Sequence, residues 1–238
     1  MKIAAVCCTY LRPVQLGRMI RCFELQDYPD AELVVLDDAG QYDGRRGDRW
    51  RLFSSRRRWP TLGEKRNAAA ALVADDVEAL AVWDDDDLYL PWALRASVAA
   101  LEIAPWSRPS LVLHPRRDGS LRQHATGGLF HGGWAYRREV FQRVGGYPAI
   151  NNGEDQGLAR RLKRAEVESA DPIQLGMQPF YVYRWGNGSG WHLSGMGRDG
   201  YRRLGNLQGE KTSLVIDDPP GLDLNDPEIL PGIRPRMF

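Results

Sequence analysis

The chain has 238 residues, of which 43% are hydrophobic and 26% charged, a length that fits one large domain with a substantial core. No apolar run reaches the roughly 20 residues that a membrane helix needs. Three cysteines without zinc-ligand spacing or a disulfide framework favour a reducing, cytoplasmic setting. Lysine and arginine number 32 against 31 acidic residues, so bulk charge favours neither a nucleic-acid binder nor a membrane-surface protein.

The first part of the chain predicts a unit of a parallel α/β sheet. Residues 2–8 form a continuous apolar run, as expected for a strand covered on both faces. Pro13 suits a first helical position, and apolar side chains follow at helical spacing from Leu16 to Phe23. Residues 32–36 form a second apolar strand. Strand, helix and strand in this order indicate parallel strands joined by a crossover helix.

Further helices and strands are expected in the rest of the chain, with short strands in its second half. Residues 39–60 are rich in glycine and arginine, and we expect a long loop that is functional or mobile. A helix is expected at 62–74, a strand at 79–83 and a helix at 91–103. A mixed region should then contain short strands at 111–114, 121–124, 134–136 and 180–184, with a helix at 154–165.

The strongest motif is the run of four aspartates from Asp84 to Asp87, at the end of the third predicted strand. Adjacent carboxylates repel one another and cost free energy when they are desolvated without a partner. Ligands of open α/β sheets bind at the carboxyl ends of strands, and a divalent cation such as Mg²⁺ or Mn²⁺ would neutralise hard oxygen ligands there. The alternative is a solvated acidic turn that caps the helix beginning at Pro91.

Two further pairs of acidic residues can each be explained either by function or by local structure. Asp37 and Asp38 end the second strand, where an acid can bind a ribose or a base, or can simply shape a turn. Glu154 and Asp155 begin a helix, where acids are either partners of the helix dipole or, for Asp155, a general base. Neither a dinucleotide-binding glycine motif nor a phosphate-binding P-loop is present.

These three acidic motifs, in this order, resemble the family 2 nucleotide-sugar glycosyltransferases. The resemblance implies the GT-A fold, an α/β architecture with a mostly parallel central sheet flanked by helices and a smaller mixed region on the acceptor side. It runs from Ile3 to about His192. Its marks are Thr9-Tyr10-x-Arg12, Asp37-Asp38, Lys65-Arg66-Asn67, Asp84–Asp87, Gly145-Gly146-Tyr147 and Glu154-Asp155.

The resemblance implies a role for each matching position. The donor nucleotide would be bound by Thr9, Tyr10, Arg12, Asp37, Arg66, Asp84 and Asp85. Asp86 would bind Mn²⁺ or Mg²⁺, helped by His192, which is otherwise an ordinary loop histidine, and Asp155 would be the catalytic base. The acceptor side and a closing loop would use Glu154, Trp134, Arg184, Trp185 and Trp191.

The implied activity is metal-dependent, inverting transfer of a sugar from a nucleotide-diphosphate donor, with a UDP-sugar expected. The acceptor hydroxyl would belong to a saccharide or to a hydroxymethylated pyrimidine of DNA. In the DNA case the arginines at 45–58, at 116–122 and at 202–203 would contact phosphates, and Trp50 and Trp59 would stack on a base; for the first group a solvated basic loop is the alternative.

A nucleotidyltransferase and a non-catalytic sugar-nucleotide-binding protein remain as other classes of function. The implied domain covers residues 1–212, with a nucleotide-binding half at about 1–104 and an acceptor and catalytic half at about 105–212. A proline-rich tail follows at 213–238.

Overall fold

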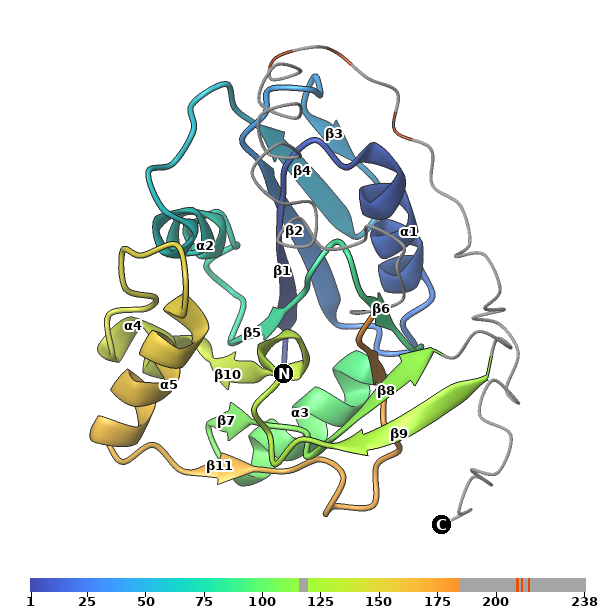
Figure 1. Ribbon diagram of the computed structural model, residues 1–238, viewed down its shortest axis with the longest axis vertical. Coiled ribbons are helices and arrows are strands. Elements are labelled where there is room, and N and C mark those ends of the chain that lie inside the picture. Colours follow the sequence, from blue (N-terminus) through green and yellow to red (C-terminus); the bar gives the residue numbers. More distant parts are fainter. Residues whose placement is uncertain (116–119, 185–208, 210, 212–213, 215–238) are drawn as a thin grey trace.

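A large mixed sheet forms the centre of the protein in the computed structural model, which describes residues 1–115, 120–184, 209, 211 and 214 (Figure 1). Its strand order is β11-β7-β10-β5-β1-β2-β4-β3. The parallel centre consists of β1 (Ile3–Thr9), β2 (Ala31–Asp37), β4 (Trp50–Ser54) and β5 (Ala79–Val82). The remaining strands are β3 (Arg45–Arg46), β7 (Trp106–Ser107), β10 (Ala135–Arg137) and β11 (Ser169–Ala170), of which β10 and β3 run antiparallel to their neighbours.

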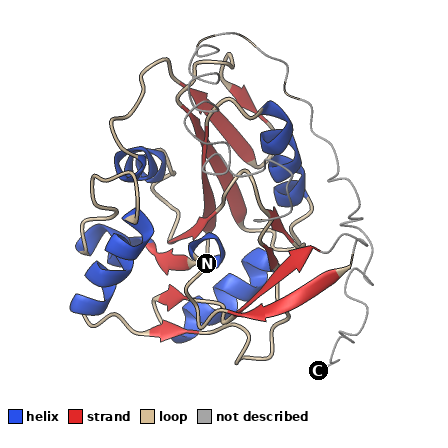
Figure 2. Ribbon diagram, in the orientation of Figure 1, coloured by secondary structure: helices blue, strands red, loops and turns tan. Residues whose placement is uncertain are grey.

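Helices cover both faces of this sheet (Figure 2). One face carries α1 (Pro13–Glu24) and α3 (Ala93–Ile103), and the other carries α2 (Leu62–Ala71), α4 (Arg138–Arg143) and α5 (Glu154–Arg164). Alternation along β1 explains the two layers, because Ile3 and Ala5 pack with α1 and α3 while Ala4 packs with the opposite set. The side chains of residues 3–7 therefore alternate between two cores, which is why this part of the strand is apolar, whereas Thr9 at its end lines the cleft.

A second sheet of four short strands lies beside the first, in the order β6-β12-β8-β9. Its strands are β6 (Leu88–Tyr89), β12 (Tyr181–Val182), β8 (Leu111–Pro115) and β9 (Leu121–Ala125). A short 3-10 helix, η1 (His131–Gly133), leads into β10. The second sheet corresponds to the smaller mixed region that the resemblance implied.

The expectation of an uninterrupted loop at 39–60 is wrong. Residues Trp50–Ser54 form β4, which pairs in parallel with β2, with Leu33 opposite Trp50. The Trp50 side chain is 8% exposed, belongs to the main core, and donates from Nε1 to Glu24 Oε1 at 3.2 Å. Trp50 is therefore a core residue and not a platform for a base.

Smaller differences concern the ends of elements. The helix expected at 62–74 ends at Ala71, the helix expected at 91–103 begins at Ala93, and the strand expected at 180–184 comprises only Tyr181 and Val182. The tail boundary at 212/213 falls outside the described residues. Among the described residues, no helix combines the length and the apolar character that crossing a membrane would require.

Candidate active site

The parallel strands β1, β2 and β5 end together at one edge of the sheet, and a cleft of about 880 Å³ opens there. The segments that follow these three strands line it, together with the beginnings of α2 and α5 and with η1. Seven carboxylates line the cleft, against four cations. The carboxylates belong to Asp38, Asp84, Asp85, Asp86, Asp87, Glu154 and Asp155, and the cations to Arg12, Arg58, Lys65 and Arg66.

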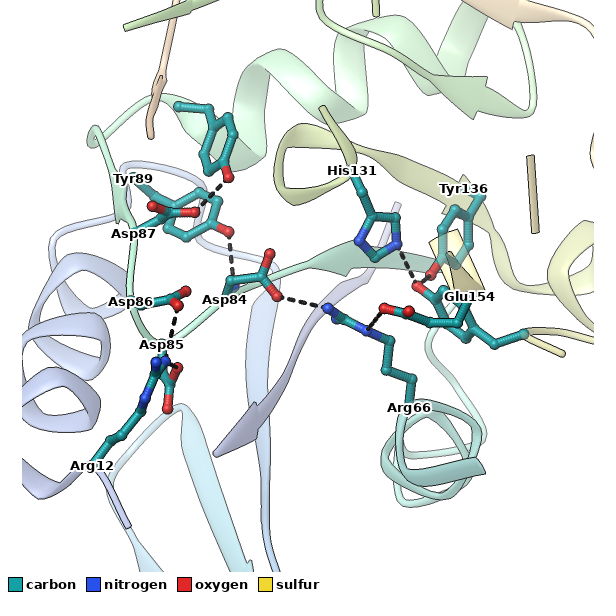
Figure 3. Close-up of polar contacts among 12 residues, drawn as sticks. Arg12, Arg66, Asp84, Asp85, Asp86, Asp87, Tyr89, His131, Tyr136 and Glu154 are labelled. Atoms are coloured by element: carbon teal, nitrogen blue, oxygen red, sulfur yellow. Dashed lines mark hydrogen bonds and ion pairs between the residues drawn. The ribbon is translucent and has the colours of Figure 1, made fainter. Parts of the chain in front are cut away.

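The run Asp84–Asp87 forms an acidic turn after β5, and Arg12 binds its middle (Figure 3). Arg12 Nη1 lies 2.8 Å from Asp85 Oδ1 and 2.9 Å from Asp86 Oδ2. Thr9 Oγ1 donates to Asp85 Oδ2 at 2.6 Å. The side chains of Arg12, Asp85 and Asp86 are almost fully buried. Burial by itself would lower the pKa of Arg12, but attraction to the two carboxylates raises it. The negative charge of the turn is therefore partly balanced by the Arg12 guanidinium, which lies directly before α1.

Asp87 anchors the same turn to the second sheet. Its carboxylate accepts from the Tyr181 hydroxyl at 2.5 Å and from the backbone N–H of Arg184 at 2.9 Å. Arg184 Nε donates to the backbone oxygen of Asp86 at 2.6 Å. Arg184 is 5% exposed and supports the turn from behind, rather than lining the cleft as the resemblance implied.

Arg66 lies between the acidic turn and the start of α5, as Figure 3 shows. Its Nη2 is 3.1 Å from Asp84 Oδ1, and its Nε is 3.3 Å from Glu154 Oε1. Burial raises the pKa of both carboxyl groups, and the Arg66 charge opposes that rise. Arg66 therefore joins two acids from different elements on one side of the cleft and favours their charged forms against the effect of burial.

At the other end of the cleft, the second acid of the Asp37-Asp38 pair faces the cavity. Asp38 Oδ1 accepts from Lys65 Nζ at 2.5 Å and from Arg58 Nη1 at 2.9 Å, and the Arg58 guanidinium lies 3.8 Å from the Tyr10 ring centroid. Asp37 is fully buried and does not line the cleft.

The Asp37 carboxylate instead shapes the turn after β2. It accepts from the backbone N–H groups of Ala39 and Gln41 at 2.9 and 3.0 Å, and from Ser54 Oγ at 2.6 Å. Asp38, and not the Asp37 named from the resemblance, is therefore the member of the pair that faces the cleft. A one-residue step reverses the direction of a side chain at a strand end, so the acidic pair alone does not show which member faces a ligand.

Asp155 lines the cleft in the first turn of α5. Its Oδ1 accepts from the backbone N–H of Gln156 at 2.7 Å, and the preceding Gly153 has a left-handed backbone with φ of 75°. The positive end of the helix dipole favours a negative charge at this position. Glu154 and Asp155 therefore bring two carboxylates to the cavity from one helix end.

Among the remaining predicted residues that the structure describes, Trp134 does not line the cleft. Trp134 is 1% exposed, donates from Nε1 to Gly128 O at 2.9 Å, and packs edge-on against Trp106, so it belongs to the core. Trp185, Trp191 and His192 lie outside the described residues.

The segment His131-Gly132-Gly133-Trp134, which the resemblance places near the acceptor or donor sugar and which is otherwise a tight turn before a strand, brings His131 to the cleft. His131 forms a hydrogen bond through Nε2 with the Tyr147 hydroxyl at 2.8 Å, and that hydroxyl lies 2.6 Å from the Tyr136 hydroxyl. Burial lowers the pKa of His131 well below its ordinary value, so the ring is neutral. The position of His131 before two glycines was visible in the sequence, but its partners lie in a distant segment.

The described residues contain no group of three or more His, Cys, Asp or Glu side chains arranged to hold a metal ion. The oxygen donors of the acidic turn nevertheless suit a hard cation, because Mg²⁺ is commonly bound by one or two carboxylates and completes its shell with water and phosphate oxygens. The excess of carboxylates over cations in the cleft favours such a cation.

No family model and no curated protein matches this sequence, whereas many solved structures match its fold. S. aureus TarS 1–349 in complex with UDP-GlcNAc superimposes with a TM-score of 0.61 at 15% identity, over 80% of this chain and 60% of TarS 1–349. Mannosyltransferase PcManGT from Pyrobaculum calidifontis, in complex with GDP-Man and Mn²⁺, superimposes with a TM-score of 0.58 at 16% identity, over 87% of this chain and 62% of PcManGT.

The catalytic domain of Drosophila β1,4-galactosyltransferase 7 gives a TM-score of 0.51 at 18% identity, over 75% of this chain and 67% of that domain. The chain thus spans about 60% of the length of the TarS and PcManGT structures. Its α/β architecture, with a large mixed sheet flanked by helices, is the GT-A fold of nucleotide-sugar glycosyltransferases, as the motifs predicted.

Proposed function

We propose that the protein is a metal-dependent, inverting glycosyltransferase that moves a sugar from a nucleotide-diphosphate donor to an acceptor hydroxyl. One observation carries the proposal: a single cleft joins the acidic turn Asp84–Asp87 to Asp155 at the start of α5, with Arg66 between them. The structural neighbours with UDP-GlcNAc and with GDP-Man and Mn²⁺ support a donor of this chemical class.

The two ends of the cleft suit the two ends of the donor. Tyr10, Asp38 and Lys65 form a polar end, with Arg58 over the Tyr10 ring, and this end suits a nucleoside because Asp38 can accept hydrogen bonds from a ribose or a base. Arg12 and Arg66 lie nearer the acidic turn, where forked guanidinium donors suit the charge of a diphosphate. The donor sugar would then point toward Asp155.

In the proposed reaction, the Asp155 carboxylate accepts the proton of the acceptor hydroxyl while the hydroxyl oxygen bonds to the anomeric carbon of the sugar. The bond from that carbon to the diphosphate oxygen breaks, and its electron pair leaves with the nucleotide diphosphate. Arg66 provides fixed positive charge near the departing oxygen. A single in-line displacement of this kind inverts the anomeric configuration.

A divalent cation, Mn²⁺ or Mg²⁺, would be held by Asp86, with Asp84 beside it in the acidic turn. It would supply positive charge that neutralises the diphosphate oxygens. Arg12, which pairs with Asp86, and Arg66, which pairs with Asp84, would fix the orientation of these two carboxylates around the cation.

The proposal is tested first by donor binding. Thermal unfolding is followed with UDP-, GDP- and dTDP-sugars in the presence of Mn²⁺, and one donor should raise the melting temperature because it binds only the folded state. EDTA should abolish both that shift and sugar transfer. If no donor shifts the melting temperature, the proposed class of donor is wrong. If transfer is undiminished in EDTA, the proposed metal dependence is wrong.

The catalytic base is tested with Asp155→Asn. The variant should keep the donor-induced shift but lose at least about 100-fold in kcat, because general-base catalysis contributes about 10²–10⁴-fold. Glu139→Gln is the matched control, since it also removes an acid from the first turn of a helix, at an exposed site in α4. Full activity of Asp155→Asn would show that Asp155 is not the base.

A further inference from the structure

A group of exposed cations lies mainly on β3 and in the segment after β4, which reaches the cleft at Arg58, and the chemistry proposed above does not use it. We call this group the arginine rim: it consists of Arg45, Arg46, Arg56, Arg57, Arg58 and Lys211. The first two form the edge strand β3, and the next three follow β4. Arg58 itself lines the cleft, and the next residue, Trp59, lines it as well.

The rim carries more positive charge than its surroundings neutralise. Its segment of the chain, residues 43–58, has two acids, Asp43 and Asp48, and both are exposed. Asp43 binds Lys211 Nζ, and that cation, with smaller effects of Arg45 and Arg56, lowers the Asp43 pKa. One acid is thus shared among three cations.

Arg58 forms an ion pair with Asp38, whereas Arg46 and Arg57 have less compensation for their charge. Arg46 lies opposite Arg51 in the β3–β4 register, and like charges directly across a strand pair are destabilising. Arg51 forms an ion pair with Glu32 at 3.0 Å. Within the described part of the chain, no ion pair joins Arg45, Arg46 or Arg57 to an acid. An excess of forked donors at a sheet edge suits an anionic partner, above all one with phosphate groups.

Trp59 adds a different kind of contact where the rim meets the cleft. Its side chain is half-buried and lines the cavity beside Arg58. Among the described residues it makes no ring–ring contact and no hydrogen bond. An indole with a free face beside a line of arginines is the combination with which proteins bind single-stranded nucleic acid, since bases stack on aromatic rings while phosphates contact the cations.

We propose that the acceptor is a nucleic acid, bound with its phosphates on the arginine rim and an unpaired base on Trp59. The nucleotide that carries the acceptor hydroxyl then enters the cleft toward Asp155. The inference rests on the proposed function for the transfer step, but the binding of the strand can be measured without it. It also explains why a near-neutral chain concentrates its arginines beside one edge of the cleft.

The rim is tested by fluorescence anisotropy with a labelled single-stranded thymidine oligomer, without donor or metal. The full-length variant with Arg45→Gln, Arg46→Gln and Arg57→Gln should bind at least about 10-fold more weakly, and its log–log salt dependence should be shallower by about 2 because three phosphate contacts are lost. The matched control carries Arg143→Gln, Arg160→Gln and Arg164→Gln, three exposed arginines of α4 and α5, and should bind like the parent protein. Absence of binding by the parent, or equal binding by both triple variants, overturns the proposal.

The identity of the partner is tested with Trp59→Leu and with inorganic polyphosphate as a second probe. Loss of one stacked base should weaken oligonucleotide binding by about 5- to 150-fold and leave polyphosphate binding unchanged. If Trp59→Leu binds the oligonucleotide as well as the parent does, the rim is a general anion surface and the nucleic-acid proposal is refuted. The donor-induced thermal shift, measured on the same preparations, shows separately whether the proposed donor site is intact.

Discussion

Arg66 is the residue whose removal should report most directly on how the cleft is held together. The Arg66, Asp84 and Glu154 side chains are only 13%, 23% and 8% exposed, so Arg66→Met leaves two largely buried carboxylates without their shared cation. Breaking a buried ion pair by removing one partner costs about 3–5 kcal/mol. Because Asp84 borders the open cleft, we expect the lower end, about 3 kcal/mol at pH 7.

The dependence of this cost on pH distinguishes electrostatics from lost packing. Burial already raises the pKa of Asp84 and Glu154, and Arg66→Met should raise both further. A carboxyl group whose folded pKa lies above its unfolded value destabilises the fold as pH rises, and this penalty fades as pH falls toward the unfolded value of about 4. The difference in unfolding free energy between the parent and the variant should therefore be smaller at pH 5 than at pH 7.

The assay is urea unfolding at both pH values, with Arg95→Met as the control. Arg95 pairs with Asp27 at 2.7 Å, but the two side chains are 54% and 39% exposed, so the control should lose at most about 1 kcal/mol at either pH. A loss for Arg66→Met that matches the control, or that is the same at pH 5 and pH 7, would refute the electrostatic reasoning.

Two further substitutions test local packing and hydrogen bonding. Gly63→Ala should lower the melting temperature and weaken donor binding, because an added Cβ would lie 1.8 Å from the backbone oxygen of Pro148 and would push α2 away from the segment before α5. The comparison is Ala68→Gly, at a half-buried position of the same helix, which should cost about 1 kcal/mol through helix propensity. An equal loss in the two variants would contradict the steric argument. Tyr147→Phe should cost about 1–3 kcal/mol in urea unfolding, because the lost hydroxyl leaves His131 and Tyr136 without their shared partner; a variant as stable as the parent would show that the three side chains do not act as a network.

The sequence predicted the layers of the fold well, because apolar runs and helical spacing report burial directly. It failed at β4, although the buried Trp50 and Leu52 alternate with more exposed neighbours as a strand requires. The arginines and glycines around this segment resembled a loop, and its burial comes only from pairing with β2. A strand at this position depends on long-range contacts that no local pattern contains.

The acidic segments named from the sequence meet at one cleft, but the direction of each side chain could not be predicted. The acids of the turn and of the α5 start do line one cleft, whereas Asp37 faces inward and Asp38 outward. Trp134 follows two glycines, as a binding-site residue often does, yet it packs in the core. Motif order identifies which segments meet, but the choice between neighbouring residues requires the register of the strand end.

The acidic turn also restricts which substitutions this cleft can accept during evolution. Its four carboxylates are tied to three separate parts of the chain: Arg12 before α1, Arg66 in α2, and the segment that contains Tyr181 and Arg184. Replacing any one acid disturbs the support of the others, so single substitutions there are costly and compensating pairs are rare. Variation among relatives, and the design of new acceptor preferences, should therefore concentrate on the outer margin of the cleft, where side chains can be exchanged without loosening the turn.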